Sequence, residues 1–230
     1  MRITKVVVIT LTAITFLLLT VVGCVPLSTE TYTYTDFTRV EVGYGFQVKL
    51  VQSNEYSISV TAPKDSFNLV QVSKEGETLI IGLKETFRGS KKAEITMPNL
   101  YQIKLSGGTR ADLNGFSSSQ DLKAELSGGS RMNGDMAAGD ADFILSGGSH
   151  MSLSGSADNL DVNVSGGSHL TLTDFSVSNA DVSLSGGSHA VVNVDGTLDA
   201  DLSGGSDLRY TGQPTLGSIK TSDGSSISGK

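Results

Sequence analysis

The sequence predicts an all-β fold, a right-handed parallel β-helix with coils of about 19 to 20 residues. The main observation is a motif made of an aliphatic residue, Ser-Gly-Gly, and Ser or Thr, which recurs every 18 to 21 residues. Its six copies begin at Leu105, Leu126, Leu145, Val164, Leu184 and Leu202. A unit this short cannot bury its own apolar face, so consecutive units are expected to stack.

Apolar residues alternate with polar ones on both sides of each motif. The column two residues before the aliphatic position is Ile103, Ala124, Phe143, Val162, Val182 and Ala200. Residues of equal parity point to one side of a strand, so this column faces the core, as do pairs after the glycines such as Leu170 and Leu172. We expect two strands per coil around a Gly-Gly corner, and a third, weaker strand at stretches such as Ser176–Val177.

The region before the repeats, residues 37–104, also alternates like strands and is expected to form less regular coils or a cap. Its predicted strands are Val40–Val42, Phe46–Leu50, Tyr56–Val60, Leu69–Ser73, Thr78–Leu83 and Ala93–Met97. Together with the repeats of 105–230 it is expected to make one continuous domain, 37–230. The polar residues 24–36 are interpreted as a tether.

The first residues carry an export signal. Arg2 and Lys5 precede an apolar run, Val6–Val22, and the small residues before Cys24 resemble the bacterial lipoprotein signal. That resemblance implies cleavage after residue 23, acylation of Cys24 and a membrane anchor for a chain outside the cytoplasm. Cys24 is the only cysteine, so an intrachain disulfide is impossible. The alternative is an uncleaved signal anchor.

Charge excludes nucleic acid as a partner. Without residues 1–23 the chain has 15 basic and 24 acidic side chains, because Arg2 and Lys5 are removed from the 17 basic residues. Residues 105–230 hold six basic and 15 acidic side chains, so the acidic excess lies on the repeats. An acidic surface repels phosphate, and lipid rather than charge must hold the chain at a membrane.

One outward column could bind a metal ion. It directly follows the motif and contains every histidine of the chain, His150, His169 and His189. Imidazoles stacked about 5 Å apart on neighbouring strands could share Zn²⁺ or Cu²⁺. The alternative is a solvated ladder produced by duplication of one coil.

A second outward column stands three residues before the motif. It consists of Asp142, Asp161, Asp181 and Asp199. Carboxylates on adjacent parallel strands repel one another unless a cation lies between them, so weak Ca²⁺ binding is one interpretation. The other is an acidic, solvated face.

No catalytic residues and no cofactor are predicted. Ser149 stands beside His150, but neighbouring residues in a strand point to opposite faces, so the pair cannot act together. We expect Ser149 to face inward, in a hydroxyl ladder with Ser130, Ser168 and Ser188. A carbohydrate-active β-helix enzyme remains a remote alternative.

The stretches Phe37–Val42, Phe46–Gln52, Thr78–Leu83 and Ile95–Leu105, followed by Ser-Gly-Gly coils, resemble the bacterial head GIN domain of the auto-transporter adhesin family. The resemblance implies a β-helical surface or periplasmic protein and brings no catalytic residues. It leaves the histidine-bearing motif unexplained.

These observations predict a lipid-anchored binding or structural module of the cell envelope, with a role in surface adhesion or recognition. A glycan or a protein is the expected ligand, and divalent metal binding is the alternative function. At the carboxyl end a decayed copy begins at Thr221, and Ile227 is expected to close a partial coil. The open edge of that coil is a candidate for self-association.

Overall fold

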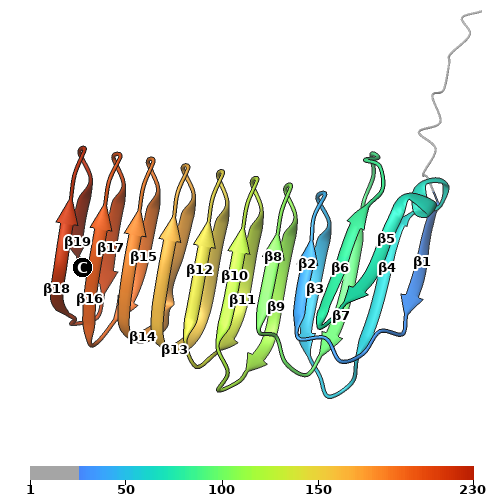
Figure 1. The fold of residues 1–230 in the computed structure, drawn as a ribbon, viewed down its shortest axis with the longest axis horizontal. Coiled ribbons are helices and arrows are strands. Elements are labelled where there is room, and N and C mark those ends of the chain that lie inside the picture. Colours follow the sequence, from blue (N-terminus) through green and yellow to red (C-terminus); the bar gives the residue numbers. More distant parts are fainter. Residues whose placement is uncertain (1–25) are drawn as a thin grey trace, which may run out of the picture.

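The protein is an elongated rod of stacked β-strands (Figure 1). β1 (Leu27–Tyr32) lies near one end, and β18 (Thr215–Thr221) and β19 (Ser226–Gly229) lie at the other. A computed structural model describes residues 26–230. Strands from consecutive coils pair in parallel along the rod, which confirms the predicted parallel β-helix. The predicted signal, residues 1–23, and Cys24 lie outside the described residues.

Each coil of the repeat region contributes one strand to each of two faces. The first face holds β8 (Gln102–Leu105), β10 (Leu122–Leu126), β12 (Ala141–Leu145), β16 (Thr197–Leu202) and β18 (Thr215–Thr221). The second face holds β9 (Arg110–Ser117), β11 (Arg131–Ala137), β15 (His189–Val194), β17 (Asp207–Thr211) and β19 (Ser226–Gly229). Neighbouring strands within each face are parallel.

Two long strands show the third side of the coil. β13 (His150–Val164) and β14 (His169–Leu184) begin on the second face and end on the first face of the next coil. Between these faces Ser156 pairs with Ser176, and Ala157 pairs with Val177. The third strand expected at Ser176–Val177 is therefore present.

The Gly-Gly corners need glycine for two different reasons. Gly147 and Gly148 both have positive φ, at 63° and 75°, which costs a side-chain-bearing residue free energy. A Cβ on Gly147 would lie 3.2 Å from the backbone nitrogen of Gly128, whereas one on Gly148 would meet open space. Corners also join adjacent coils, since the Gly148 N–H donates to the Gly166 carbonyl at 3.0 Å.

The hydroxyl residue that follows each corner is buried and completes the turn. The column consists of Thr109, Ser130, Ser149, Ser168, Ser188 and Ser206, each at most 1% exposed. The Oγ of Ser149 donates to the Ser146 carbonyl at 2.7 Å, and the Ser149 N–H donates to Ser168 Oγ at 3.1 Å. The inward orientation of Ser149 is confirmed, and its hydroxyl bonds to backbone groups of the corner.

Inward-facing aliphatic columns fill the rod. The motif aliphatics are at most 2% exposed: Leu105, Leu126, Leu145, Val164, Leu184 and Leu202. Each such side chain contributes about 1.5–3 kcal/mol by leaving water. Phe143 and Phe175 pack at a 60° tilt, with ring centroids 6.0 Å apart. One continuous core thus runs along the rod.

The first region of the chain places its strands out of sequence order. Its elements are β2 (Arg39–Val42), β3 (Gln47–Gln52), β4 (Ser57–Pro63), the 3₁₀ helix η1 (Lys64–Leu69), β5 (Val70–Glu75), β6 (Thr78–Leu83) and β7 (Lys92–Met97). β2 lies between β6 and β8, and β3 lies between β7 and β9. The antiparallel strands β4 and β5 pair with β7 and β6 and finish this end.

The predicted tether, residues 24–36, is partly wrong. β1 (Leu27–Tyr32) pairs with β4 in antiparallel register along its whole length. Threonine and tyrosine favour the extended backbone, and the edge of β4 supplies hydrogen-bond partners for it. The stretch Leu27–Tyr32 of this segment is therefore a strand of the folded domain.

The far end is less well covered. Leu216 of β18 is 47% exposed, while Ile227 of β19 packs against the core and closes the last coil as expected. Within residues 26–230, β18 and β19 pair only with the strands of the preceding coil. Self-association through this edge stays a prediction.

We expect the two glycines of a corner to respond differently to alanine. Gly148→Ala should lower the free energy of unfolding by about 1 kcal/mol through backbone strain alone. Gly147→Ala should cost about 2 kcal/mol or more, because its Cβ also crowds the backbone of Gly128. Denaturant unfolding of the full chain measures both, and equal effects would contradict this account of the corner.

Candidate functional site

Any site must lie on the outside of the rod, because its inside is a packed core. The predicted lipidation residue, Cys24, lies outside the described part of the chain. A search of residues 26–230 finds no helix with the length and apolar character needed to cross a membrane. The candidate surfaces are therefore the two columns predicted from the motif and their neighbours.

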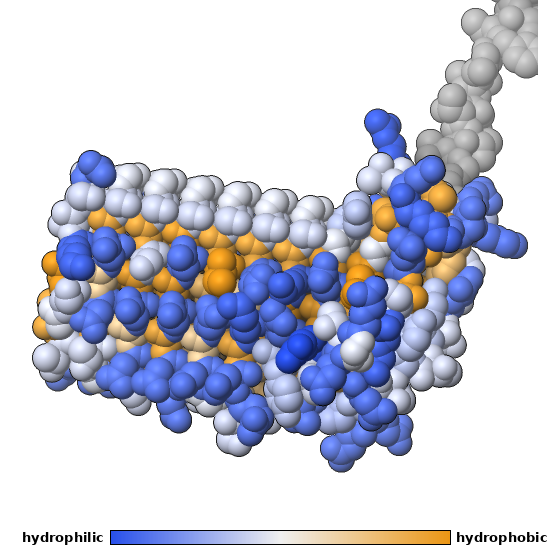
Figure 2. Space-filling model, viewed as in Figure 1, coloured by the Kyte–Doolittle hydropathy of each residue, from blue (hydrophilic) through white to orange (hydrophobic). Residues whose placement is uncertain are grey.

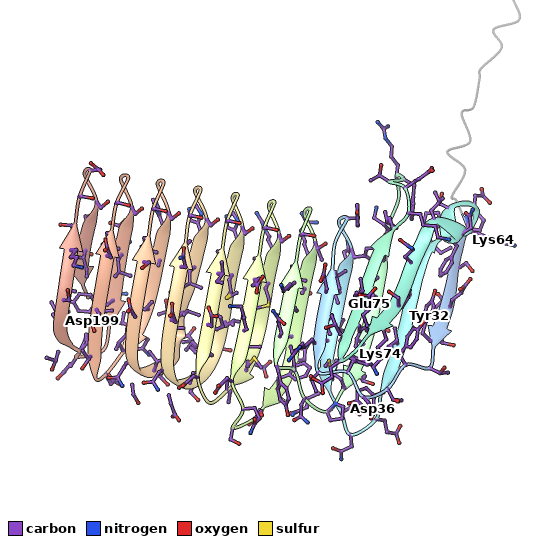
Figure 3. The ribbon with its side chains drawn as sticks, viewed as in Figure 1. Tyr32, Asp36, Lys64, Lys74, Glu75 and Asp199 are labelled. Carbon is purple, nitrogen blue, oxygen red and sulfur yellow. The ribbon has the colours of Figure 1, made fainter. Side chains whose placement is uncertain are left out.

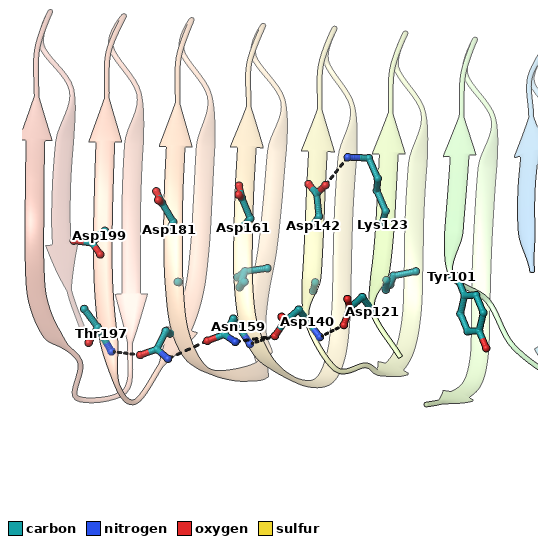
Figure 4. Close-up of a pocket in the computed structure, with 15 residues that line it drawn as sticks. Tyr101, Asp121, Lys123, Asp140, Asp142, Asn159, Asp161, Asp181, Thr197 and Asp199 are labelled. Carbon is teal, nitrogen blue, oxygen red and sulfur yellow. Dashed lines mark hydrogen bonds and ion pairs between the residues drawn. The ribbon is translucent and has the colours of Figure 1, made fainter. Parts of the chain in front are cut away.

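The four predicted aspartates lie side by side on the first face (Figure 4). Asp142 pairs in register with Asp161, Asp161 with Asp181, and Asp181 with Asp199. Lys123 occupies the same position in the preceding coil, and its Nζ forms an ion pair with Asp142. A row of carboxylates thus has one lysine at its amino-terminal end.

Repulsion within this row affects the pKa of Asp161. Partial burial is the largest cause that raises the pKa of this carboxyl above its usual value, followed by the charges of Asp142 and Asp181. The more distant Lys123 acts in the opposite direction. At the end of the row, Asp199 Oδ1 accepts a hydrogen bond from the Ser218 N–H. The anion of Asp161 is therefore destabilised by partial burial first and by the neighbouring carboxylates second.

A second polar row runs parallel to the aspartates, and the sequence analysis did not identify it. It stands five residues before the motif aliphatic of every copy after the first and consists of Asp121, Asp140, Asn159, Asn179 and Thr197. The Asn159 amide donates to Asp140 Oδ1 at 2.8 Å, and the Asn179 amide donates to Asn159 Oδ1 at 3.0 Å. Thr197 N–H then donates to Asn179 Oδ1 at 3.0 Å. The recurrence of Asp and Asn at this offset was the available signal.

A groove of about 530 Å³ lies between the two rows. In Figure 2 the polar rows on this face run along the rod in blue, with orange apolar rows beside them. The groove has Tyr101 and Lys123 at one end, and its other charged lining groups are aspartates. Such a surface suits cationic or polyhydroxylated ligands and disfavours phosphate. Among residues 26–230, no three His, Cys, Asp or Glu side chains are arranged to hold a metal ion.

The predicted histidine ladder is present on the second face. The rings of His150 and His169 are parallel within 3° and 4.8 Å apart, and His169 and His189 are 5.0 Å apart at 60°. His150 Nδ1 lies 3.1 Å from the Gly148 carbonyl. Arg131 precedes the histidines in register and Asp207 follows them. The column is outward-facing, as its parity predicts.

The stacked rings do not form a convergent metal site. A nitrogen lone pair lies in the plane of its ring, and a Zn–N bond is about 2.0–2.1 Å, so an ion in the plane of His150 lies outside the plane of His169. Desolvation by burial, then the charges of His150 and His189, lower the pKa of His169. The neutral form of His169 is thus favoured, and metal binding by the ladder stays a prediction.

The Ser149 and His150 pair has the geometry of a structural turn. Ser149 is fully buried and donates to the Ser146 carbonyl, while the His150 ring lies on the outer surface. Nucleophilic catalysis requires the serine hydroxyl to reach both the imidazole and a substrate. The pair therefore does not provide it.

Asp161→Asn should stabilise the protein at neutral pH. Because the folded-state pKa of Asp161 is raised above its unfolded value, its charged form costs folding free energy, by a few tenths of a kcal/mol for exposed like charges on neighbouring strands. As pH falls through the folded-state pKa towards about 4, the carboxyl is protonated and the advantage of the variant should disappear.

Thermal unfolding at pH 7 and pH 3.5 measures this difference. Asp112→Asn is the matched control, because Asp112 is an exposed strand aspartate whose register partners are Lys49 and Asn133. A stabilisation of the Asp161 variant that persists at pH 3.5 would contradict the electrostatic explanation.

Solved structures similar to this chain share its fold. A putative adhesin from Bacteroides fragilis matches with a TM-score of 0.81 and 18% identity, over 89% of this chain and 97% of that one. A putative adhesin from Parabacteroides distasonis has a TM-score of 0.72 and 17% identity, over 90% and 98%. One from Parabacteroides merdae has a TM-score of 0.66 and 16% identity, also over 90% and 98%. No curated protein matches the chain.

The family comparison covers most of the described domain. Residues 36–214 match the model described as "Putative auto-transporter adhesin, head GIN domain". This range begins just before β2 and ends between β17 and β18. It therefore includes the coil formed by β2 and β3, both polar rows and the histidine ladder. The resemblance inferred from the strand pattern and the Ser-Gly-Gly coils is thereby confirmed, and the chain belongs to the head GIN domain family of auto-transporter adhesins.

Proposed function

We propose that this chain is a surface adhesion module, anchored in a bacterial envelope by lipid on Cys24, that binds its ligand through the outer faces of the rod. The observation that carries the proposal is the family match over residues 36–214, whose description names adhesion. The similar solved structures are described as adhesins too, and at their low identity they support the fold alone.

The shape of the molecule suits a role at a surface. β1 begins at Leu27, soon after Cys24, so a lipid on that cysteine would hold the rod by its amino-terminal end. The chain then runs along the rod to β18 and β19 at the opposite end (Figure 1). A rod held in this way presents the aspartate and histidine columns to its surroundings, away from the anchor.

Binding rather than catalysis agrees with the chemistry of the outer columns. Hydrogen bonds join neighbouring side chains of the second polar row, such as the one between Asn159 and Asp140. These bonds hold the side chains in place on the surface of the rod. A catalytic carboxylate or nucleophile needs a neighbouring group that gives it the protonation state required to react with the substrate. The buried Ser149 lacks such an arrangement.

Cys24→Ser should release the protein from the membrane. The lipid is the expected anchor, since the acidic repeats give little attraction to anionic headgroups. In cells fed radioactive palmitate, the wild-type chain should be labelled and sediment with membranes, whereas the variant should be unlabelled and extractable by buffer. A variant that sediments with membranes as completely as wild type would reject lipid anchoring.

Beads coated with the full chain should attach to target surfaces in a saturable manner. Panels of bacterial cells, epithelial cells and immobilised glycans test this, with free chain as competitor and heat-unfolded chain on matched beads as control. A folded rod with ordered polar columns should bind, and the unfolded one should not. Attachment no greater than that of the control on every surface would reject the adhesion proposal.

A further inference from the structure

The first corner of the β-helix differs from the six Ser-Gly-Gly corners. Register pairing of β2 with β8, and of β3 with β9, aligns Tyr44 with Gly107 and Gly45 with Gly108. Tyr44 has a φ of 61°, close to the 60° of Gly107. A residue with a side chain pays about 1–2 kcal/mol for this conformation. Each Ser-Gly-Gly copy has glycine at this position, and in the last corner Asp223 occupies it with a φ of 52°. Among the corners of residues 26–230, the first is therefore the one that accepts this strain to carry an aromatic ring.

The first corner has room for a large side chain. A Cβ on Gly128 would point at the Gly107 nitrogen, and one on Gly107 would lie 3.3 Å from the Tyr44 nitrogen, so corner side chains point towards the preceding coil. For Tyr44 the preceding coil is that of β6 and β7, which are joined by an irregular loop instead of a corner. Its ring lies over Gly82, where an added Cβ would be 3.5 Å from Tyr44 Cε2.

The ring borders a cavity of about 560 Å³. The floor is formed around Ile80 and Gly82 of β6, and the polar lining groups are Glu41, Gln71, Ser73, Glu75 and Ser106. The register places Ser73 and Glu41 on either side of Ile80, and Gln71 beside Gly82. Figure 3 shows Glu75 in this first region, far along the rod from Asp199. This cavity is therefore separate from the acidic groove.

The lining has the mixed chemistry of a site for a small polar ligand. The volume lies within the range of about 300–1,000 Å³ that is usual for ligand sites. Tyr44 is 51% exposed and so offers a ring to solvent. Gln71 and Ser73 can donate and accept hydrogen bonds, while Glu41 and Glu75 accept them. The carboxylates disfavour anions, and Lys104, in register with Glu41, reduces the negative charge.

We propose that this cavity binds a neutral sugar ring of a surface glycan, stacked on Tyr44. The proposal rests on the adhesion function and names its ligand class. An aromatic face is electron-rich and attracts the C–H groups on the apolar side of a pyranose. The sugar hydroxyls then bond to Glu41, Gln71, Ser73 and Glu75, which matches their mixture of donors and acceptors.

Tyr44→Gly is a sharp test because it restores the corner glycine and removes only the ring. The probes are methyl glycosides of glucose, galactose, mannose and N-acetylglucosamine, titrated one at a time into the full chain in detergent. We expect at least one to shift the Gly82 amide resonance of wild type. Tyr44→Phe should bind that sugar similarly, while Tyr44→Gly should bind it about tenfold more weakly or worse. Thermal unfolding checks that both variants are folded.

The site is overturned if no glycoside shifts Gly82, or if folded Tyr44→Gly binds as well as wild type. A stronger response to tetramethylammonium than to every sugar would overturn it in favour of a cation site. The bead experiment separates this proposal from adhesion itself. If beads carrying Tyr44→Gly attach as wild type does, adhesion stands and this site is rejected; if a glycoside binds but no beads attach, the site stands and adhesion is rejected.

Discussion

The parallel pairing of one coil on the next is the constraint on which the rest of the structure depends. A β-helix has no antiparallel hairpins to fix its register in the repeats, so every coil must match the length and corner of its neighbour. The corner glycines supply this match, because their carbonyls and N–H groups bond to the next corner, as Gly148 does to Gly166. The buried serines then satisfy the remaining corner carbonyls, as Ser149 does for Ser146.

Function is confined to the outside by the same constraint. Since the inward columns are filled by aliphatic residues and the corners by backbone bonds, only alternate outward positions are free to vary. Identical outward residues then form rows with the spacing of parallel strands, about 4.8 Å. Such rows produce like-charge repulsion at Asp161 and ring stacking at His150. Repetition by itself therefore creates electrostatic properties that a single coil would lack.

Much of the fold could be predicted because the repeat has a local cause. Parity alone identified the core columns, the inward Ser149 and the outward histidines, since strand geometry has a period of two. The insertion of β2 and β3 between later coils could not be predicted, because it depends on pairing between distant segments with similar patterns. For the same reason the sequence did not point to Tyr44. Its alignment with Gly107 becomes visible only when β2 and β8 are known to pair. The Asn159 row was visible as a recurrence but lacked a reason until its hydrogen bonds were seen.

The early position of β2 and β3 in the chain also affects how the molecule can fold while it is synthesised. β2 and β3 are made before β6 and β8, both of which pair with β2. Their edges stay open until those strands emerge, and contacts between distant segments form slowly. The repeats, by contrast, can add one coil at a time onto the edge already formed. Synthesis from the amino end therefore divides the molecule into a slow nucleus, which forms only after β9 is made, and a repeat region whose coils add to that nucleus one at a time.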